Sequence, residues 1–348
     1  MVLYETAGVI CTNPVFSPDG GSILLVSNHF KSKTDLLLIR PDGTVINNLT
    51  KGVGSNGCAV WSRDGRRIVF SSTRDGQSDI YQIRPDGTDL INLTNTSTED
   101  ERFPFYSPHG KKLIFSRGTI KKRRHEEGYE WNETVNNHLV IANADGTGQR
   151  IFAPDGWKGW WSPDSKWVVY TDMHGEGIWV QPVDGGERRR LVDGKPISWT
   201  PDGTAIFYRP PRRGIDQNVD VRRININGSG DRLVLKDYSL DYSYEGDPKR
   251  FWDPTASLLA LVVYRMIGVR DGGVVIVDRD GNIVSDFREQ GSGFDYEPTA
   301  SWSADGNWVL FRKYHSIRWG GVYMVNVRSG EQRRVIADSV EIITKTRP

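Results

Sequence analysis

The 348-residue sequence has little cysteine, almost no excess charge and no long apolar segment. Its 45 basic and 44 acidic residues give a formal net charge of +1, which argues against a general electrostatic attraction to nucleic acid. No apolar run reaches the roughly 18 residues that a membrane span requires, and no stretch shows the 3.6-residue period of an amphipathic helix. We therefore expect an all-β protein that neither binds nucleic acid nor inserts into a membrane.

The two cysteines, Cys11 and Cys58, lie one repeat apart, at near-equivalent places in the predicted innermost strands. A disulfide between them is conceivable. Disulfide geometry is narrow and neighbouring sheets diverge, so we expect two free, buried thiols instead.

One short motif occurs seven times: an aromatic residue, then Ser-Pro-Asp-Gly or a near variant, then a β-branched run. A repeat in this range that contains several strands predicts a β-propeller. The copies are about 48 residues apart and begin at Phe16, Trp61, Tyr106, Trp161, Trp199, Trp252 and Trp302.

A second turn motif in each repeat predicts four strands per blade. Arg-Pro-Asp-Gly at residues 40–43 recurs at residues 84–87, and weaker Asp-Gly or Asn-Gly forms follow in other copies. Such dipeptides between apolar runs indicate tight hairpins. In the second copy we predict strands A to D, from the centre outward, at residues 59–62, 66–72, 79–84 and 89–94. The A–B turns then lie at one end of each blade, and the B–C loops and D–A connections lie at the other.

We expect residues 1–348 to form a single propeller of seven four-stranded antiparallel blades. Residues 2–5 align with a strand D position, so they are predicted to pair into the last blade and close the ring. Six or eight blades are less favoured alternatives, because the sixth copy, Trp-Asp-Pro-Thr-Ala, has lost its turn glycine.

The second copy, from Trp61 to Thr94, resembles the WD-like repeat of TolB-type β-propellers, and the resemblance extends from about residue 4 to residue 336. That family includes TolB, which binds protein partners, the propeller domains of oligopeptidases, and a group of polysaccharide lyases that cleave uronic-acid glycans. The resemblance implies the fold. It also favours a periplasmic or secreted location, although no export signal is recognisable at the N-terminus.

The position thirteen residues beyond each anchor aromatic predicts a basic rim, because six of its seven residues are Arg or His. Those residues are His29, Arg74, Thr119, His174, Arg212, Arg265 and His315. All are expected where strand B enters the B–C loop. Arg74 belongs to the repeat pattern, and pairing with a nearby acidic group is the alternative role for it. The histidines replace the patterned residue, and a rim of Arg and His suits an anionic ligand.

Further candidate ligand-binding residues lie near the same end of the blades. An insertion at residues 119–137 and two connections at residues 236–248 and 288–298 are long, and long loops in compact repeats are often functional. Their aromatic residues could stack on sugars, or the loops could form a lid that merely covers the channel. These additional candidates are Arg117, Tyr129, Trp131, Arg209, Tyr244, Tyr264, Tyr296, Arg312, Tyr314, Arg318 and Trp319.

Two functions follow from this rim. In a lyase, β-elimination at a uronic acid needs a group that neutralises the carboxylate, a base and an acid. Resemblance to the propeller lyases suggests His174 or His315 as base and Tyr314 or Tyr264 as acid. The suggested neutralising groups are Arg265, Arg312 and Arg212. The alternative is a non-catalytic module that binds a protein or glycan partner at the same end.

No cofactor is predicted. A divalent metal held by His29, His174 and His315 is possible but not favoured. These residues come from the first, fourth and seventh copies, and the fourth blade stands across the ring from the other two.

Overall fold

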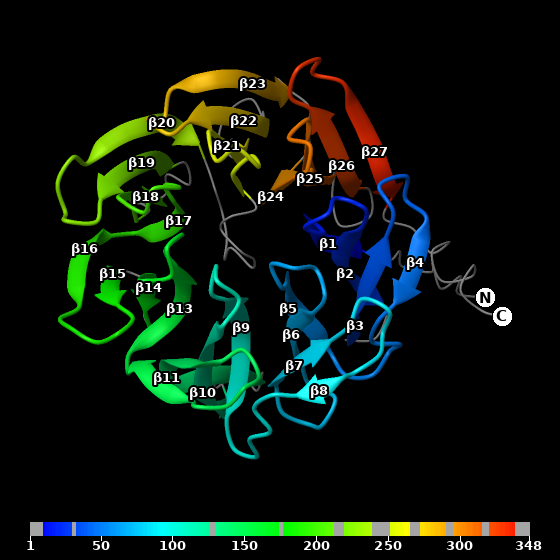
Figure 1. The fold of residues 1–348 in the computed structure, drawn as a ribbon, viewed down its shortest axis with the longest axis vertical. Helices are drawn as coiled ribbons and strands as arrows, with labels where there is room; N and C mark the ends of the chain where they lie inside the picture. Colours follow the sequence, from blue (N-terminus) through cyan, green and yellow to red (C-terminus); the bar gives the residue numbers. More distant parts are fainter. Residues whose placement is uncertain are drawn as a thin grey trace.

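The computed structural model describes residues 10–29, 33–124, 130–173, 177–211, 219–238, 251–264, 272–289, 295–314 and 320–337. These residues form strands and turns arranged as seven antiparallel sheets around a ring (Figure 1). No helix in the described segments is long and apolar enough to cross a membrane. The predicted seven-bladed β-propeller is confirmed.

Each blade is a meander whose strands follow chain order from the centre to the outside (Figure 1). Blade 1 contains β1 (Ile10–Phe16), β2 (Ile23–His29), β3 (Lys33–Ile39) and β4 (Val45–Asn48). Blade 2 contains β5 (Asn56–Trp61), β6 (Ile68–Ser72), β7 (Asp79–Ile83) and β8 (Ile91–Asn92). Blade 3 contains β9 (Asp100–Tyr106), β10 (Lys112–Arg124), β11 (Glu130–Asn143) and β12 (Arg150–Ala153). Blade 4 contains β13 (Gly156–Trp161), β14 (Trp167–Asp172), β15 (Gly177–Pro182) and β16 (Arg189–Asp193).

The remaining blades follow the same plan, with one shortened inner strand. Blade 5 contains β17 (Lys195–Trp199), β18 (Ala205–Arg209), β19 (Val219–Asn225) and β20 (Arg232–Tyr238). Blade 6 contains β21 (Leu258–Tyr264), β22 (Gly272–Asp278) and β23 (Ile283–Glu289), and a single bridge between Trp252 and Leu259 occupies the innermost position. Blade 7 contains β24 (Asp295–Trp302), β25 (Trp308–Tyr314), β26 (Gly320–Asn326) and β27 (Gln332–Ala337).

The repeated Ser-Pro-Asp-Gly segment forms the A–B turn. In blade 1 the Ser17 hydroxyl donates to Asp19 Oδ1 at 2.6 Å, and the Gly20 amide donates to the Ser17 carbonyl at 2.9 Å. Gly20 has a φ of +73°, a conformation that favours glycine. Ala256 takes this place in blade 6 with a φ of +56°. There Asp253 Oδ1 accepts the amide of Leu258 at 2.6 Å, so the sixth copy keeps its turn without the glycine.

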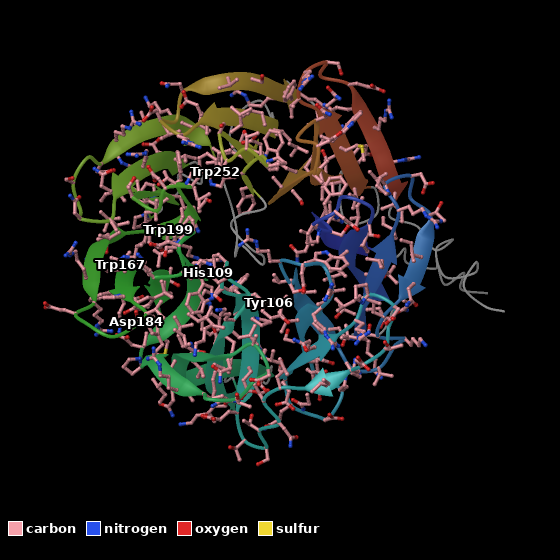
Figure 2. All side chains as sticks on the ribbon, in the orientation of Figure 1. Tyr106, His109, Trp167, Asp184, Trp199 and Trp252 are labelled. Atoms are coloured by element: carbon pink, nitrogen blue, oxygen red, sulfur yellow. The ribbon has the colours of Figure 1, made fainter. Side chains whose placement is uncertain are left out.

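Anchor tryptophans connect neighbouring blades around the inner ring. Figure 2 shows Tyr106, Trp199 and Trp252 closer to the central opening than Trp167 and Asp184. The indole nitrogens of four anchors donate to backbone carbonyls of the preceding blade: Trp161 to Phe105 at 3.2 Å, Trp199 to Trp160 at 3.3 Å, Trp252 to Trp199 at 2.8 Å and Trp302 to Phe251 at 2.8 Å. The Trp61 indole nitrogen is buried and has no acceptor among the described residues.

The core is divided at blade 1. One cluster runs from blade 2 to blade 7, whereas blade 1 contributes to two smaller clusters, one on each side. Leu25 belongs to the cluster shared with blade 7, and Leu24 belongs to the cluster shared with blade 2. The Phe16 amide also donates to Ser301 Oγ of blade 7 at 3.1 Å. Blade 1 therefore closes the ring through its own packing on both neighbours.

Two predictions fall on residues outside the described part. Residues 2–5, predicted to close the ring, are among them, and the four described strands of blade 7 all come from residues 295–337. The side chain of Cys11 is also outside, so the relation between the two cysteines stays a prediction. Cys58 is half-buried and packs against the main core.

The expectation of a loop throughout the insertion at residues 119–137 is wrong. Most of it continues strands β10 and β11, which pair from Thr119 opposite Val135 to Arg124 opposite Glu130. The register sets Lys121 opposite Glu133. The connection at residues 288–298 is similarly shortened, because β23 extends to Glu289 and β24 begins at Asp295.

Candidate functional site

Eight of the seventeen candidate site residues lie outside the described residues. Those are Tyr129, His174, Arg212, Tyr244, Arg265, His315, Arg318 and Trp319. For five further candidates the backbone is described and the side chain is not: His29, Trp131, Tyr264, Tyr296 and Tyr314.

Backbone positions nevertheless place several of these candidates at one end of the blades. His29, Tyr264 and Tyr314 are the last residues of β2, β21 and β25, the B strands of three blades. Tyr296 lies in the inner strand β24, opposite Lys313. The backbones of these residues therefore lie at the B–C end of their blades.

Four described cations lie near these strand ends in blades 3, 5 and 7. Arg209 and Arg312 occupy the same repeat position in β18 and β25 and are 6% and 5% exposed. Lys313 Nζ donates to Glu289 Oε1 of blade 6 at 2.9 Å and lies over the Tyr323 ring. Arg117 occupies the position of Lys313 in blade 3.

The contacts of Arg74 among the described residues are with neutral side chains rather than with the acidic group that the alternative role expected. Its guanidinium donates to Ser72 Oγ at 3.2 Å and to Asn56 Oδ1 at 3.5 Å. It also lies 4.9 Å from the centre of the Tyr81 ring, a cation–π contact. Burial lowers the pKa of Arg74, opposed by the nearby Tyr81 and Asp75. These contacts hold the side chain against its own blade.

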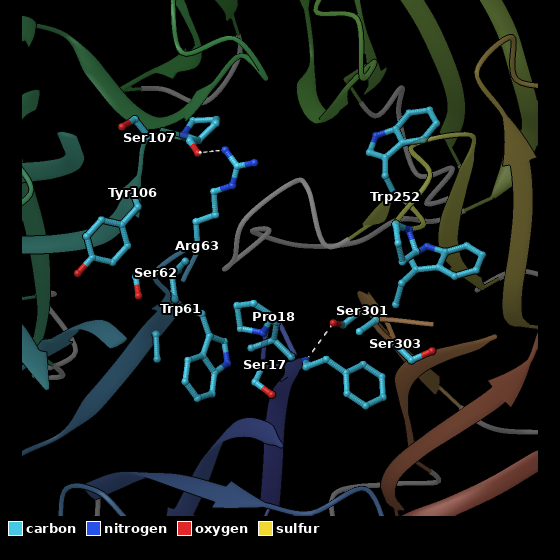
Figure 3. Close-up of a pocket in the computed structure, with 18 residues that line it drawn as sticks. Ser17, Pro18, Trp61, Ser62, Arg63, Tyr106, Ser107, Trp252, Ser301 and Ser303 are labelled. Atoms are coloured by element: carbon cyan, nitrogen blue, oxygen red, sulfur yellow. Dashed lines mark hydrogen bonds between the residues drawn. The ribbon is translucent and has the colours of Figure 1, made fainter. Parts of the chain in front are cut away.

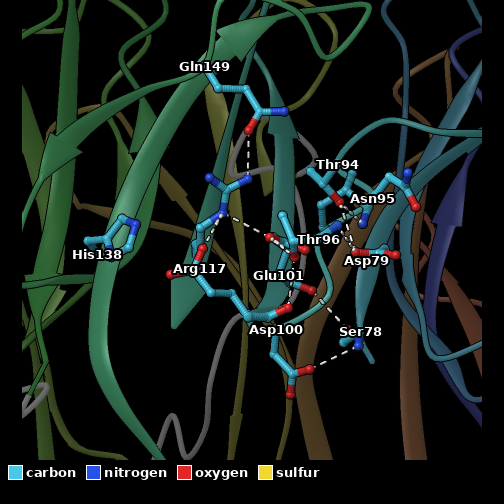
Figure 4. Close-up of polar contacts among 12 residues, drawn as sticks. Ser78, Asp79, Thr94, Asn95, Thr96, Asp100, Glu101, Arg117, His138 and Gln149 are labelled. Atoms are coloured by element: carbon cyan, nitrogen blue, oxygen red, sulfur yellow. Dashed lines mark hydrogen bonds and ion pairs between the residues drawn. The ribbon is translucent and has the colours of Figure 1, made fainter. Parts of the chain in front are cut away.

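Arg117 is held in a polar network between blades 2 and 3 (Figure 4). Its Nε donates to Glu101 Oε1 at 2.8 Å, and Nη2 donates to Gln149 Oε1 at 2.6 Å. The Thr96 hydroxyl donates to the same Glu101 oxygen at 2.8 Å. Glu101 is fully buried, and its second oxygen, Oε2, has no hydrogen-bond donor among the described residues.

The carboxyl group of Glu101 has a raised pKa. Burial raises its pKa from 4.5 to about 7, against the lowering effects of the Thr96 hydroxyl and the Arg117 guanidinium. A hydrogen bond with the buried carboxyl of Asp79 also raises it. The protonated form of Glu101 is therefore favoured where blade 3 meets blade 2.

The described residues offer no fit for a bound metal. No group of three His, Cys, Asp or Glu side chains among them is placed to hold an ion. The side chains of His29, His174 and His315 lie outside that part of the chain.

A cavity of about 330 Å³ lies at the A–B turn end, opposite the predicted rim (Figure 3). Its walls include Trp61, Tyr106, Trp252 and Trp302, and Arg63 is the one ionisable side chain other than tyrosine among the described residues that line it. The sequence analysis missed this site because it examined only the B–C loops. The signal was present, since Arg63 replaces the proline found after Ser or Thr in the first, third, fourth and fifth copies.

Comparisons with known proteins agree with this architecture. Residues 4–171 match the model of the TolB beta propeller domain. Comparison with the curated proteins gives no match.

Three solved structures illustrate the similarity of fold. A puromycin hydrolase is 17% identical, with a TM-score of 0.68 over 93% of this chain and 53% of its own. A puromycin-hydrolyzing peptidase of Mycobacterium tuberculosis is 12% identical, with a TM-score of 0.70 over 97% and 55%. An oligogalacturonate lyase in complex with manganese is 13% identical, with a TM-score of 0.59 over 95% and 86%. The chain spans about half the length of the first two.

The fold and the repeated turn chemistry define the class of protein as a seven-bladed β-propeller built from blades of the WD-like type. Within that class, residues 4–171 are similar to the TolB beta propeller domain.

Proposed function

We propose that the B–C end of the propeller binds a uronic-acid-containing glycan and cleaves it by β-elimination. One observation carries the proposal: cations from separate blades lie at equivalent repeat positions of strand B, with Arg117 in blade 3, Arg209 in blade 5, and Arg312 and Lys313 in blade 7. Guanidinium groups bind carboxylates through paired hydrogen bonds. A polyanion that lies across this end would meet several of them.

The chemistry assigns one role to each residue type. Arg265 or Arg312 neutralises the uronate carboxylate, which acidifies the neighbouring C–H bond. His174 or His315 removes that proton, and the C–H electron pair forms a carbon–carbon double bond as the glycosidic oxygen leaves. Tyr264 or Tyr314 gives the leaving oxygen its proton. The products are an unsaturated uronide and a free hydroxyl end.

The fold comparison supports this assignment. The chain covers 86% of the oligogalacturonate lyase but only 53% and 55% of the two puromycin-hydrolysing enzymes. Similarity therefore extends over most of a protein named for cleaving a uronate glycan.

A second function, recognition without catalysis, is favoured by the pairing of two described cations. Arg117 is bonded to Glu101, and Lys313 is bonded to Glu289. Cations already neutralised by acids contribute less to the turnover of an anionic substrate. They suit a mixed-charge surface that binds a glycan or a protein partner.

The test is to incubate the protein with a panel of uronate glycans and follow the ultraviolet absorbance of the unsaturated product. Parallel reactions contain either EDTA or added Mn²⁺. We expect turnover of at least one glycan, and a rate loss of about 100-fold or more in His315→Ala and Arg265→Ala. His109→Ala, at the opposite end, is the matched control and should keep full activity.

Three other results would each contradict part of the proposal. Absorbance that stays flat across the panel while glycan binding persists would replace catalysis with recognition. No binding of any glycan would overturn the assignment of this end. Full activity in both the His315 and the Arg265 variants would remove those residues from the mechanism.

A further inference from the structure

We propose that the cavity at the A–B turn end is a second ligand site, which takes a small organic acid with a single carboxylate and an apolar body. This inference does not depend on the proposed glycan chemistry, because the cavity lies at the other end of every blade. It rests on the lining of the cavity, its charge and the way Arg63 departs from the repeat.

Arg63 is a local exception in the turn that forms the cavity rim. At the equivalent place, Pro18, Pro108 and Pro254 also line the cavity, and Ala304 lines it in blade 7. Proline suits this turn position because its fixed φ matches the turn. Arginine gives up that advantage, and it places a cation where the other described blades present apolar surface.

The Arg63 guanidinium is positioned across a blade boundary. Figure 3 shows it extending from blade 2 to blade 3, where Nη1 donates to the Pro108 carbonyl at 3.3 Å. The guanidinium has five N–H donors in all. None of the described acidic side chains forms an ion pair with it. Asp64, the next residue, instead accepts bonds from Ser62 Oγ at 2.6 Å and from the Arg66 amide at 3.1 Å.

The rest of the lining suits an apolar body. Indole and phenol rings from blades 2, 3, 6 and 7 form the walls with Phe16 of blade 1, and none of the described residues that line the cavity is a carboxylate. A volume of about 330 Å³ is at the lower end of the range for small-molecule sites, which are largely apolar with a few orienting polar groups. A compact aromatic or aliphatic acid fits this description.

The single positive charge of Arg63 in the described lining favours a ligand with one negative charge. One guanidinium balances one carboxylate in a fork-like pair. An inorganic phosphate dianion would leave a second negative charge uncompensated among apolar walls, which is costly. A neutral amide of the same shape would lose the charge-assisted hydrogen bonds.

The test titrates the full chain with phenylacetate, and the tryptophans that line the cavity report binding through their fluorescence. Phenylacetamide has the same shape without the charge, and acetate and inorganic phosphate lack the apolar body. We expect saturable binding of phenylacetate, with phenylacetamide, acetate and phosphate each at least about 10-fold weaker.

Two variants locate the site. Arg63→Pro introduces the residue found at this place in every other blade except blade 7, so we expect it to fold and to lose phenylacetate affinity by about 10-fold or more. Arg66→Ala, which removes an exposed cation from the same turn outside the cavity lining, should bind as the unmodified protein does. Equal binding of phenylacetate and phenylacetamide, or unchanged affinity in folded Arg63→Pro, would overturn the proposal. So would the absence of saturable binding, whatever the glycan assay shows.

Discussion

Several buried charged side chains lie where one blade meets the next. Lys158 of blade 4 lies 3.6 Å from the centre of the Phe103 ring of blade 3, and Lys313 of blade 7 reaches Glu289 of blade 6. Breaking a buried pair by removing one partner costs more than losing an exposed one, so these contacts help to fix the position of each blade relative to its neighbour.

The raised pKa of Glu101 predicts a dependence of stability on pH. Between about pH 4.5 and pH 7 Glu101 is protonated in the folded state and ionised in the unfolded state. The folded state therefore binds more protons, and the free energy of unfolding falls as pH rises through this window. We expect Glu101→Gln to remove this fall, which is on the order of 2 kcal/mol.

Urea unfolding at pH 5 and pH 8 measures this effect. Glu99→Gln is the matched control, because Glu99 lies 3.7 Å from the same Arg117 and its side chain is 34% exposed. The control should keep the pH dependence of the unmodified protein. If Glu101→Gln keeps it as well, then Glu101 is not the titrating group.

At the scale of the element, the turn chemistry could be predicted from sequence because it is local. A serine, an aspartate and a residue of positive φ lie within four positions, and they form the same turn wherever they recur. Features that depend on residues far apart in the sequence could not be predicted in this way. The hairpin at residues 119–137 depends on cross-strand pairing, and the burial of Glu101 depends on the preceding blade. Arg63 could have been found from sequence as a break in the pattern, but its position on a cavity could not.

The inner chain of indole bonds predicts unequal effects of equivalent substitutions. Trp161→Phe leaves the Phe105 carbonyl without its indole donor, whereas Trp61→Phe removes a buried donor that has no described acceptor. Both changes remove the same atoms from anchors of similar burial, 6% and 8% exposed. Trp161→Phe should therefore cost about 1–2 kcal/mol more than Trp61→Phe, since an unpaired buried polar group is costly. Chemical denaturation of both variants measures the difference, and equal losses would show that the indole bonds contribute nothing specific.

At the scale of the whole molecule, the question is how the first and last blades are joined. All four described strands of blade 7 come from the C-terminal part of the chain, so this junction does not require a strand exchanged between the two ends. Blade 1 instead packs through separate apolar clusters on blade 7 and blade 2. A ring closed in this way is stabilised equally at both boundaries, whereas an open ring would be stabilised only at the boundary between blades 1 and 2.

Adjacent leucines in β2 test this closure. Leu24 is 1% exposed and faces the blade 2 cluster, and Leu25 is 0% exposed and faces the blade 7 cluster. A buried leucine changed to alanine loses transfer energy and leaves a cavity, at a cost of about 2–5 kcal/mol. We expect Leu24→Ala and Leu25→Ala to lower the free energy of urea unfolding by similar amounts within that range, each in one cooperative transition. A loss near zero for Leu25→Ala alone would mean that the ring is open between blades 7 and 1 in solution, because only that side chain depends on contact between the two ends of the chain.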